Sequence, residues 1–245
     1  MQLKLSTWME IEAYLKKSTG IIIPIGSMEQ HGPMGLIGTD SICPEKVAMG
    51  IAEKTNVVIG PTLSIGMSQH HLGFSGSITL RPSTLMAVIK DVVYSLNCHG
   101  FTHMFFLNGH GGNVAPVKNA FSEIYAEYSL ASKKAPMILQ ICNWYEGKRI
   151  AAISEKYFKD AEGSHATPSE VSLSFFAHPE AEKRVVLSPQ VVPDGNFRDA
   201  ANYRETFPDG RIGSDSSLAS ISIGEEIFQA AITDVLEAYE PFLSL

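Results

Sequence analysis

Six side chains of metal-binding type lie in three separated segments of this 245-residue chain. They are Glu29, His31, Asp40, His110, His165 and Glu170. The three carboxylates and two of the three imidazoles suffice to hold one or two borderline divalent ions such as Zn²⁺ or Mn²⁺. The third histidine is then not needed as a ligand. An ion held in this way lowers the pKa of bound water to about 7 and supplies hydroxide at neutral pH. The residue types therefore indicate a metal-dependent hydrolase.

The first segment contains Glu29 and His31, and Asp40 closes the same segment. In an extended backbone, residues two apart project to the same side, so a carboxylate and an imidazole can reach one ion. Neighbouring glycines allow the tight turns that bring the backbone close to a ligand. Taken alone, Glu29 and His31 could equally be exposed polar residues of a loop. Asp40 could cap the helix that follows or bridge two ions.

His110 lies in Asn108-Gly-His-Gly-Gly-Asn113, directly after a run of apolar residues. The flanking glycines permit left-handed backbone conformations, so the ring can point into a crevice. The same glycines could instead form an anion cradle of backbone N–H groups, or a plain turn. The segment matches neither the dinucleotide-binding nor the P-loop fingerprint, which favours the metal interpretation.

The third segment places His165 before Glu170 at the start of a predicted helix. Thr167-Pro168-Ser169-Glu170 has Thr at the N-cap, Pro at the first helical position and Glu at the third, which is the pattern of a capping box. On that pattern alone Glu170 would only cap the helix, and its role as a ligand depends on the other segments. His165 could be a ligand, a general acid or base, or a surface histidine.

The remaining histidines give weaker signals. His70 and His71 precede a Gly/Ser-containing segment and are expected at the entrance of a pocket. We expect the other three, His99, His103 and His178, to be structural or exposed. Gly66-Met-Ser-Gln-His lacks the second glycine of a nucleophile elbow, which argues against a serine hydrolase.

Composition restricts the class of protein. Hydrophobic residues make up 44% and charged residues 18%, as in an ordinary globular protein that can bury a substantial core. A net charge of -7, without long runs of basic residues, argues against a nucleic-acid surface. Three cysteines without a close pair argue against a disulfide scaffold and for a reducing compartment. We find no secretory signal or membrane-spanning run, and therefore expect a cytoplasmic protein.

Short β-branched runs alternate with longer helical patterns, and these elements must position the side chains described above. The expected strands are Ile21–Ile25, Val57–Ile59, Phe101–Leu107 and Met137–Cys142, with Ser77–Leu80 as a further extended piece. The expected helices are Thr7–Lys17, Pro44–Lys54, Ser83–His99, Ala115–Leu130, Gly147–Lys159, Glu170–Phe176 and Ser220–Ala238. The Pro/Gly/Asp-rich stretch Ser188–Asp215 has no regular pattern.

This alternation predicts a single α/β domain over residues 1–245, with a mainly parallel sheet covered by helices on both faces. In such sheets, ligands bind beyond the carboxyl ends of the strands. The Glu29 segment follows Ile21–Ile25, and the His110 segment follows Phe101–Leu107. Both segments are therefore expected at the same edge of the sheet.

Five segments, in order and with suitable spacing, resemble those of the creatininase (creatinine amidohydrolase) family. They are Gly26-Ser-Met-Glu-Gln-His-Gly-Pro33, Gly38-Thr-Asp40, His71-x-x-Phe74-x-Gly76, Asn108-Gly-His-Gly-Gly-Asn113 and His165-Ala-x-x-x-Glu170-x-Ser172. The resemblance covers roughly residues 20 to 175 and implies a creatininase-like α/β core with two Zn²⁺ or Mn²⁺ ions per chain. It also implies a small-molecule substrate and assembly into homohexamers. The net charge and the lack of a long apolar run argue against nucleic acid and membrane as partners.

The resemblance assigns a role to individual residues. The metal ligands would be Glu29 and His110 for one ion, His31 and Glu170 for the other, and Asp40 as the bridge. The catalytic residues would be His165, which moves protons, and Glu162, which accompanies it. The substrate-binding residues would be His71, Ser77, Gly111, Gly112 and Trp144. The implied reaction is hydrolysis of a non-peptide C–N bond in a cyclic amide or a formamide.

The chain departs from the creatininase pattern at three positions. Creatininases carry a metal-binding glutamate where this chain has Gly112, an aromatic residue in place of Gly111, and a tryptophan in place of Ala161. These differences favour a metal-dependent amidohydrolase and argue against creatinine as its natural substrate. Family members with the Gly-Gly form include enzymes that act on formamidopyrimidines and on modified peptides, and both substrate classes stay open. Two other classes stay open, namely a metal-free phosphate- or nucleotide-binding module built on the glycine-rich loop and an inactive structural relative.

Overall fold

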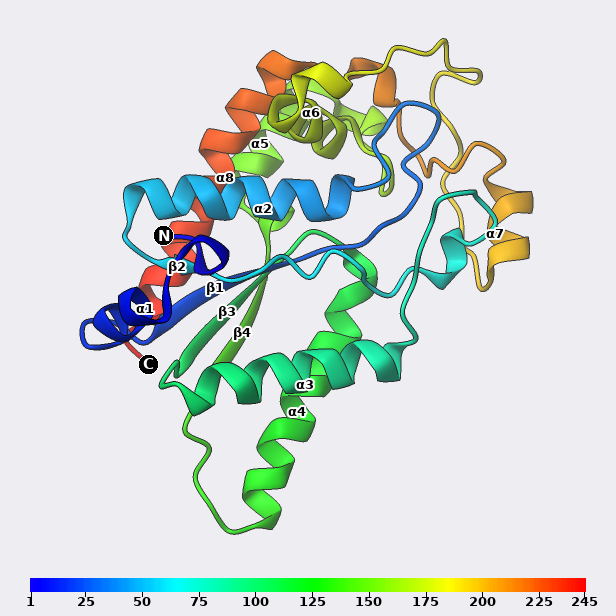
Figure 1. Cartoon of the computed structure of the whole chain (residues 1–245). Coiled ribbons are helices and arrows are strands. Elements are labelled where there is room, and N and C mark those ends of the chain that lie inside the picture. The colour runs from blue at the N-terminus through cyan, green and yellow to red at the C-terminus, as the bar shows by residue number, and fades with distance from the viewer.

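Four parallel strands form the centre of the computed structural model, which describes residues 1–245 (Figure 1). Their order across the sheet is β2-β1-β3-β4. The strands are β1 (Gly20–Ile25), β2 (Val58–Ile59), β3 (His103–Asn108) and β4 (Ile138–Asn143). Because every neighbouring pair is parallel, the carboxyl ends of the strands lie at one edge. The predicted α/β class with a parallel sheet is confirmed, and the single-domain interpretation stays a prediction.

The chain has eight α-helices, and six of them cover the two faces of the sheet (Figure 1). The eight helices are α1 (Trp8–Leu15), α2 (Thr39–Lys54), α3 (Pro82–Cys98), α4 (Val114–Leu130), α5 (Lys148–Tyr157), α6 (Pro168–Ala177), α7 (Ala200–Thr206) and α8 (Ile221–Phe242). α2, α5, α6 and α8 lie on one side of the sheet, and α3 and α4 lie on the other. None of the helices combines the length and the apolar character needed to cross a membrane.

Successive residues of the strands supply two separate hydrophobic cores, one on each face of the sheet. In β1, Ile22 packs into the core beneath α2 and α8, whereas Ile21 and Ile23 pack into the core beneath α3 and α4. In β3, Phe105 belongs to the first core and Phe106 to the second. Successive strand side chains point to opposite faces, so strands buried on both faces consist of unbroken apolar runs.

Most predicted elements are present, with shifted ends. α1 begins with the predicted capping box at Thr7. Ser77–Leu80 is not a strand, because its only pairing is an isolated bridge between Met28 and Ile78. The stretch Ser188–Asp215 contains one helix, α7, which the sequence pattern did not predict.

α2 begins earlier than predicted, at Thr39 rather than Pro44. A proline can stand near the start of a helix, but it has no N–H to offer the carbonyl four residues before it. That carbonyl belongs to Asp40. The backbone of Gly26 and of Gly109 packs against it so closely that a Cβ on either glycine would lie 2.1 Å from the Asp40 oxygen. The early start therefore places Asp40 directly at the carboxyl ends of β1 and β3.

Candidate metal centre

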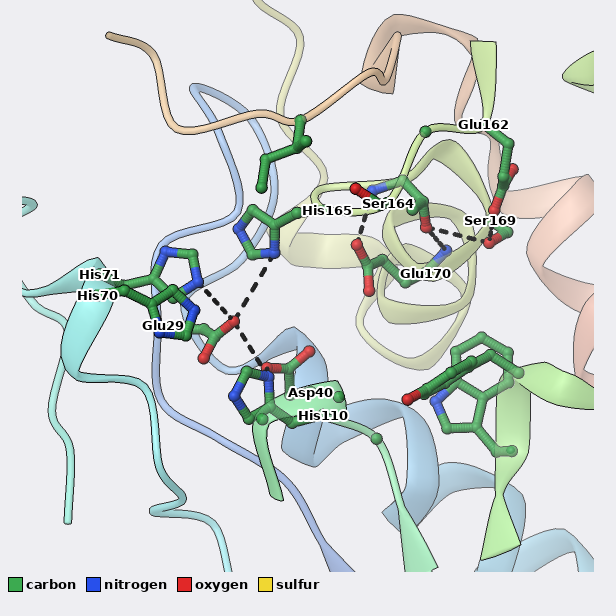
Figure 2. Close-up of a pocket in the computed structure, with 18 of the residues that line it drawn as sticks. Glu29, Asp40, His70, His71, His110, Glu162, Ser164, His165, Ser169 and Glu170 are labelled. Atoms are coloured by element: carbon green, nitrogen blue, oxygen red, sulfur yellow. Dashed lines mark hydrogen bonds and ion pairs between the residues drawn. The ribbon is translucent and has the colours of Figure 1, made fainter. Parts of the chain in front are cut away.

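Glu29 lies at the centre of the site, in the loop that follows β1 (Figure 2). Its side chain is fully buried, and neither carboxylate oxygen has a hydrogen-bond partner. Ring nitrogens of three histidines stand around its Oε1, at 3.2 Å for His71, 3.3 Å for His110 and 3.7 Å for His165. A buried carboxylate without hydrogen bonds is costly, so this arrangement favours a bound cation.

Asp40 connects two histidines from different segments of the sequence. Its Oδ1 lies 3.1 Å from Nε2 of His31, and its Oδ2 lies 3.1 Å from Nδ1 of His110. Asp40 is not the helix cap that the sequence left open, because the N-cap of α2 is Gly38. A carboxylate that presents its two oxygens to two separate groups of donors can bridge a pair of ions, which in two-metal sites stand about 3.5–4 Å apart.

Backbone carbonyls fix the orientation of the two rings beside Asp40. Nδ1–H of His31 donates to the carbonyl of Glu29 at 3.1 Å, and Nε2–H of His110 donates to the carbonyl of Met67 at 2.9 Å. Each ring therefore turns its other nitrogen towards Asp40, and this is the nitrogen that would coordinate an ion. Histidines that ligate metals use the second ring nitrogen in this way, since the hydrogen bond sets the tautomer and the ring angle.

Glu170 caps α6 and also faces the candidate metal site. Its Oε1 accepts a hydrogen bond from the backbone N–H of Thr167 at 2.6 Å, which completes the predicted capping box of α6. Its Oε2 lies 3.8 Å from Nε2 of His31. One oxygen caps the helix and the other faces the site, so the capping box positions the candidate ligand.

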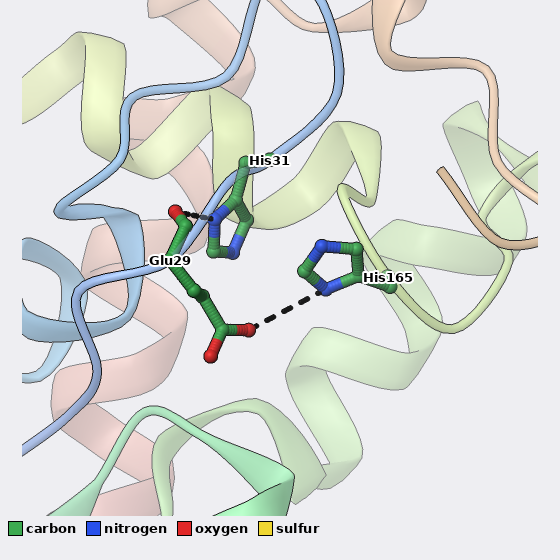
Figure 3. Close-up of side chains that lie close together, drawn as sticks. All are labelled: Glu29, His31 and His165. Carbon is green, nitrogen blue, oxygen red and sulfur yellow. Dashed lines mark hydrogen bonds and ion pairs between the residues drawn. The ribbon is translucent and has the colours of Figure 1, made fainter. Parts of the chain in front are cut away.

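His165 lies beside Glu29 and His31 (Figure 3). Its Nε2–H donates to the backbone carbonyl of Gln30 at 2.8 Å, which leaves Nδ1 as the free nitrogen facing Glu29. Burial, together with the nearby rings of His71 and His31, holds the pKa of His165 well below its ordinary value. The imidazole is therefore neutral, with an unprotonated Nδ1 directed at the site.

The carboxylates give the site a strong preference for positive charge. Burial lowers the pKa of His31, but Asp40 and Glu170 outweigh this effect and raise the pKa to about 10. Burial likewise opposes the charged form of His110, and Glu29 and Asp40 nevertheless raise its pKa to about 9. Burial would raise the pKa of Asp40, yet the two histidines hold it well below its usual range. A divalent cation would meet the same demand while the rings stay neutral.

The potential ligand atoms form three groups, in each of which all atoms lie within 4.8 Å of one another. The groups are Glu29–Asp40–His110, His31–Asp40–Glu170 and Glu29–His31–His165. The first two groups share Asp40, and their oxygen and nitrogen donors suit Zn²⁺ or Mn²⁺. A bound ion would also satisfy the buried oxygens of Glu29 and Asp40 that lack hydrogen bonds. The fold thus brings together all six side chains that the sequence singled out.

A comparison of the sequence with models of protein families identifies the family of this chain. Residues 4–239 match the creatininase family model, described as creatinine amidohydrolase. The chain belongs to the creatininase family. The resemblance inferred from five short segments is confirmed, and it extends over nearly the whole chain.

Relatives within the creatininase family act on different substrates. The chain is 28% identical over 262 aligned positions to the 3-dehydro-scyllo-inosose hydrolase of Thermotoga maritima, which covers 94% of this chain and 79% of that protein. It is 25% identical over 244 positions to the creatinine amidohydrolase of Pseudomonas putida, with 95% and 93% covered. A solved structure described as "Creatininase Mn" has a TM-score of 0.82 at 23% identity, with 98% of both chains covered, and confirms the fold.

Two glycines distinguish this creatininase-family site from the pattern expected of creatininases. A Cβ on Gly112 would lie 2.4 Å from Nε2 of His110 and 2.6 Å from the carbonyl oxygen of Met67. A side chain at position 112 would collide with the His110 ring and with the carbonyl that accepts the hydrogen bond of this ring. Position 112 therefore supplies no metal ligand while His110 keeps this orientation. At Gly111 the space is open, and the nearest atom to a Cβ is the hydroxyl oxygen of Tyr145 at 3.8 Å.

The site forms part of a cavity of about 800 Å³. The residues predicted to bind substrate or move protons that line this cavity are His71, Gly111, Gly112, Trp144, Glu162 and His165. Ser77, also predicted to bind substrate, is not among the lining residues. Its hydroxyl oxygen instead accepts a hydrogen bond from the backbone N–H of Gln30 at 3.2 Å. Ser77 therefore supports the Glu29 loop from outside the cavity.

Three residues of the site were not predicted from the sequence, namely Gln30, Tyr145 and Phe197. The side-chain amide nitrogen of Gln30 lies 2.9 Å from Nδ1 of His71, and the backbone carbonyl of Gln30 accepts from Nε2–H of His165 at 2.8 Å, so Gln30 fixes the two rings relative to each other. Tyr145 follows the carboxyl end of β4 closely, so the rule that ligands bind beyond strand ends would have found it. Phe197 comes from the irregular stretch and stacks on His70, a contact that no local pattern indicates.

Gly109→Ala should disturb the centre without touching a ligand side chain. The added methyl group would lie 2.1 Å from the Asp40 carbonyl oxygen and 2.8 Å from Cδ of Pro44. Overpacking of this kind costs about 1–3 kcal/mol of unfolding free energy, and a displaced α2 should bind less metal. Thermal unfolding and metal analysis measure the two effects. The matched control is Gly111→Ala, where the added group meets only open space, and equal losses in both variants would contradict the explanation.

Proposed function

We propose that this creatininase-family protein is a metal-dependent amidohydrolase that cleaves a non-peptide C–N bond in a cyclic amide or a formamide. The observation that carries the proposal is the carboxylate of Asp40, which two groups of ligand atoms share. A centre of two Zn²⁺ or Mn²⁺ ions per chain fits this arrangement. Membership of the family supports the hydrolase class, and the structure described as "Creatininase Mn" supports the metal.

The proposed ligands divide between two ions. They are Glu29, His110 and Asp40 for one ion, and His31, Glu170 and Asp40 for the other. Divalent ions in such a centre lower the pKa of water and polarise a carbonyl oxygen. The substrate would lie in the cavity beside these ligands, against His71, Gly111, Gly112 and Trp144.

His165 is the proposed proton carrier. The hydrogen bond from its Nε2 to Gln30 holds the ring in place, while Nδ1 faces Glu29 without a proton. The ring can take up a proton at Nδ1 and deliver it to the leaving nitrogen, as general acid–base catalysis requires. Its low pKa keeps the ring in the basic form before the reaction.

The two alternative functions have less support. A phosphate-binding module would place cationic side chains beside the glycine-rich loop, but no Lys or Arg lines the cavity. An inactive relative would bind metal without turnover, and the free ring nitrogen of His165, which faces the metal ligands, favours an active enzyme instead. Assembly as a homohexamer and a cytoplasmic location stay predictions.

Metal removal from the purified protein tests the proposal. We expect about one to two equivalents of Zn or Mn per chain, and a chelator should abolish hydrolysis across a panel of cyclic amides and formamides. Adding the ion back should restore activity and raise the unfolding temperature, because a ligand that binds only the folded state stabilises it. A protein that binds no ion, or that stays active without one, would disprove the proposal. Metal without any turnover would favour the inactive relative.

A further inference from the structure

The charges around the cavity are distributed unevenly. Its lining includes four carboxylates and no Lys or Arg. The carboxylates belong to Glu29, Asp40, Glu162 and Glu170. Three of them are proposed metal ligands, and two divalent ions bound there would leave that end of the cavity with one net positive charge. Glu162 is then the only carboxylate of the lining that no ion neutralises.

The cationic side chains of α5 do not reach the cavity. This helix contributes Ile150, Ala151 and Ser154 to the lining. Its lysines and its arginine instead form ion pairs with α8, namely Lys148–Glu237, Arg149–Asp234 and Lys156–Glu226. The helix that walls the cavity therefore offers Glu162 no positive partner.

The carboxylate of Glu162 is only half satisfied. Its Oε1 accepts a hydrogen bond from the hydroxyl of Ser169, whereas Oε2 is buried and has no partner. Burial raises the pKa of Glu162, since removal from water disfavours the charged form. In Figure 2, Glu162 and Ser169 lie together, with Glu170 between them and the labelled histidines. Glu162 is not hydrogen-bonded to His165, whose Nε2–H donates to a backbone carbonyl.

Aromatic side chains line the same cavity. Trp144 and Tyr145 come from the segment after β4, and Phe197 stacks on His70 with 4.6 Å between the ring centroids. The faces of aromatic rings attract cations and offer nothing to an anion. The aromatic residues of the cavity lining therefore favour a cationic ligand, as the carboxylate of Glu162 does.

We propose that Glu162 binds a cationic nitrogen group of the substrate, such as an ammonium, amidinium or guanidinium group. The inference rests on the proposed function, because the metal centre fixes the scissile carbonyl elsewhere in the cavity. The cation would give Oε2 the hydrogen bond that it lacks, and charge-assisted hydrogen bonds of this kind are stronger than neutral ones. An anionic group at this position would find no positive partner. Glu162 is thus a specificity residue rather than a companion of His165 in proton transfer.

Alkyl hydroxamates with different tails test this inference, because the hydroxamate group chelates metal ions. Compounds of matched length would end in an ammonium, a methyl or a carboxylate group, and several lengths would be compared. Calorimetry on the Zn-loaded protein should show the ammonium compound binding about tenfold tighter than the methyl compound at the length that reaches Glu162. The carboxylate compound should bind most weakly. Equal binding of all tails at every length, or a preference for carboxylate, would overturn the inference.

Glu162→Gln separates the charge from the shape of this side chain. Gln retains an acceptor for the Ser169 hydroxyl, so the fold should persist. We expect the ammonium preference to vanish, while the affinity for the methyl compound changes by less than about twofold. Asp160→Asn is the matched control, because it removes the same charge at an exposed position outside the cavity lining, and it should keep the preference.

The outcomes distinguish the inference from the proposed function. An ammonium preference that survives in Glu162→Gln overturns the role of Glu162. Tail-independent binding to a metal-loaded protein rejects the inference and leaves the metal centre standing. If the protein holds no metal and binds no hydroxamate, the proposed function is wrong and the inference is wrong with it.

Discussion

The Asp40→Asn variant is expected to lose both ions and nearly all hydrolytic activity. The two carboxylate oxygens lie 3.1 Å from the ring nitrogens of His31 and His110, and both groups of ligand atoms share this residue. Asn has the same shape, but it offers one neutral oxygen and turns an N–H donor towards the second ion. Because each ion contributes several kcal/mol to the stabilisation of developing charge, the rate should fall about a hundredfold or more.

Metal analysis and kcat/KM measure this effect, and His31→Ala provides the comparison. His31 belongs to only one of the two groups that share Asp40, so its loss should leave roughly one ion per chain while activity is still abolished. Thermal unfolding in the presence of a chelator shows whether the variants fold as the metal-free wild type does. An Asp40→Asn protein that retains both ions would disprove the shared carboxylate.

The His165→Gln variant should retain its metal and lose turnover. The free Nδ1 of His165 faces Glu29, and the proposed ligand set does not use it. A positioned proton carrier contributes a factor of about 10²–10⁴ to the rate, so kcat should fall by that amount. Metal content and kcat, measured on the same preparation, test the assignment.

Two further observations complete the His165 experiment. His178→Gln is the control, since His178 is exposed and contacts Glu180 outside the cavity, and its activity should be unchanged. If His165→Gln is purified without metal, His165 acts as a ligand instead, in the group that it forms with Glu29 and His31. The assignment of a proton carrier would then be wrong.

The sheet could be predicted from the sequence because its central strands are buried on both faces. Ile21–Ile25 and Phe101–Leu107 are short apolar runs bounded by glycine or polar residues, a pattern that depends only on local sequence. The start of α2 differs from the prediction, because Pro44 indicates a helix boundary by its lack of an N–H, whereas the helix begins at Thr39 and contains this proline. The short helix α7 depends on packing with distant residues and leaves no periodic pattern of its own.

The candidate metal ligands could be predicted because their chemistry is rare and strand ends bring them to one edge. The detailed contacts within the site could not be predicted from the sequence. The pattern at Glu170 predicts a capping box but does not show that the second oxygen is free to face His31. Gln30 contacts His71 through its side-chain amide and His165 through its backbone carbonyl, and the amide also donates to the carbonyl of Gly210, far away in the sequence. Such contacts depend on the folded chain and have no local signature.

The loop after β3 places a tightly packed residue and an open one two positions apart. Gly109 supports the backbone that carries Asp40, whereas Gly111 faces free space near the hydroxyl of Tyr145. A library of side chains at position 111 is therefore expected to change the shape of the cavity while the proposed metal ligands stay in place. Under the proposed function, natural divergence or directed evolution at this one position would change which small molecule fits the cavity and leave the ligand residues unchanged.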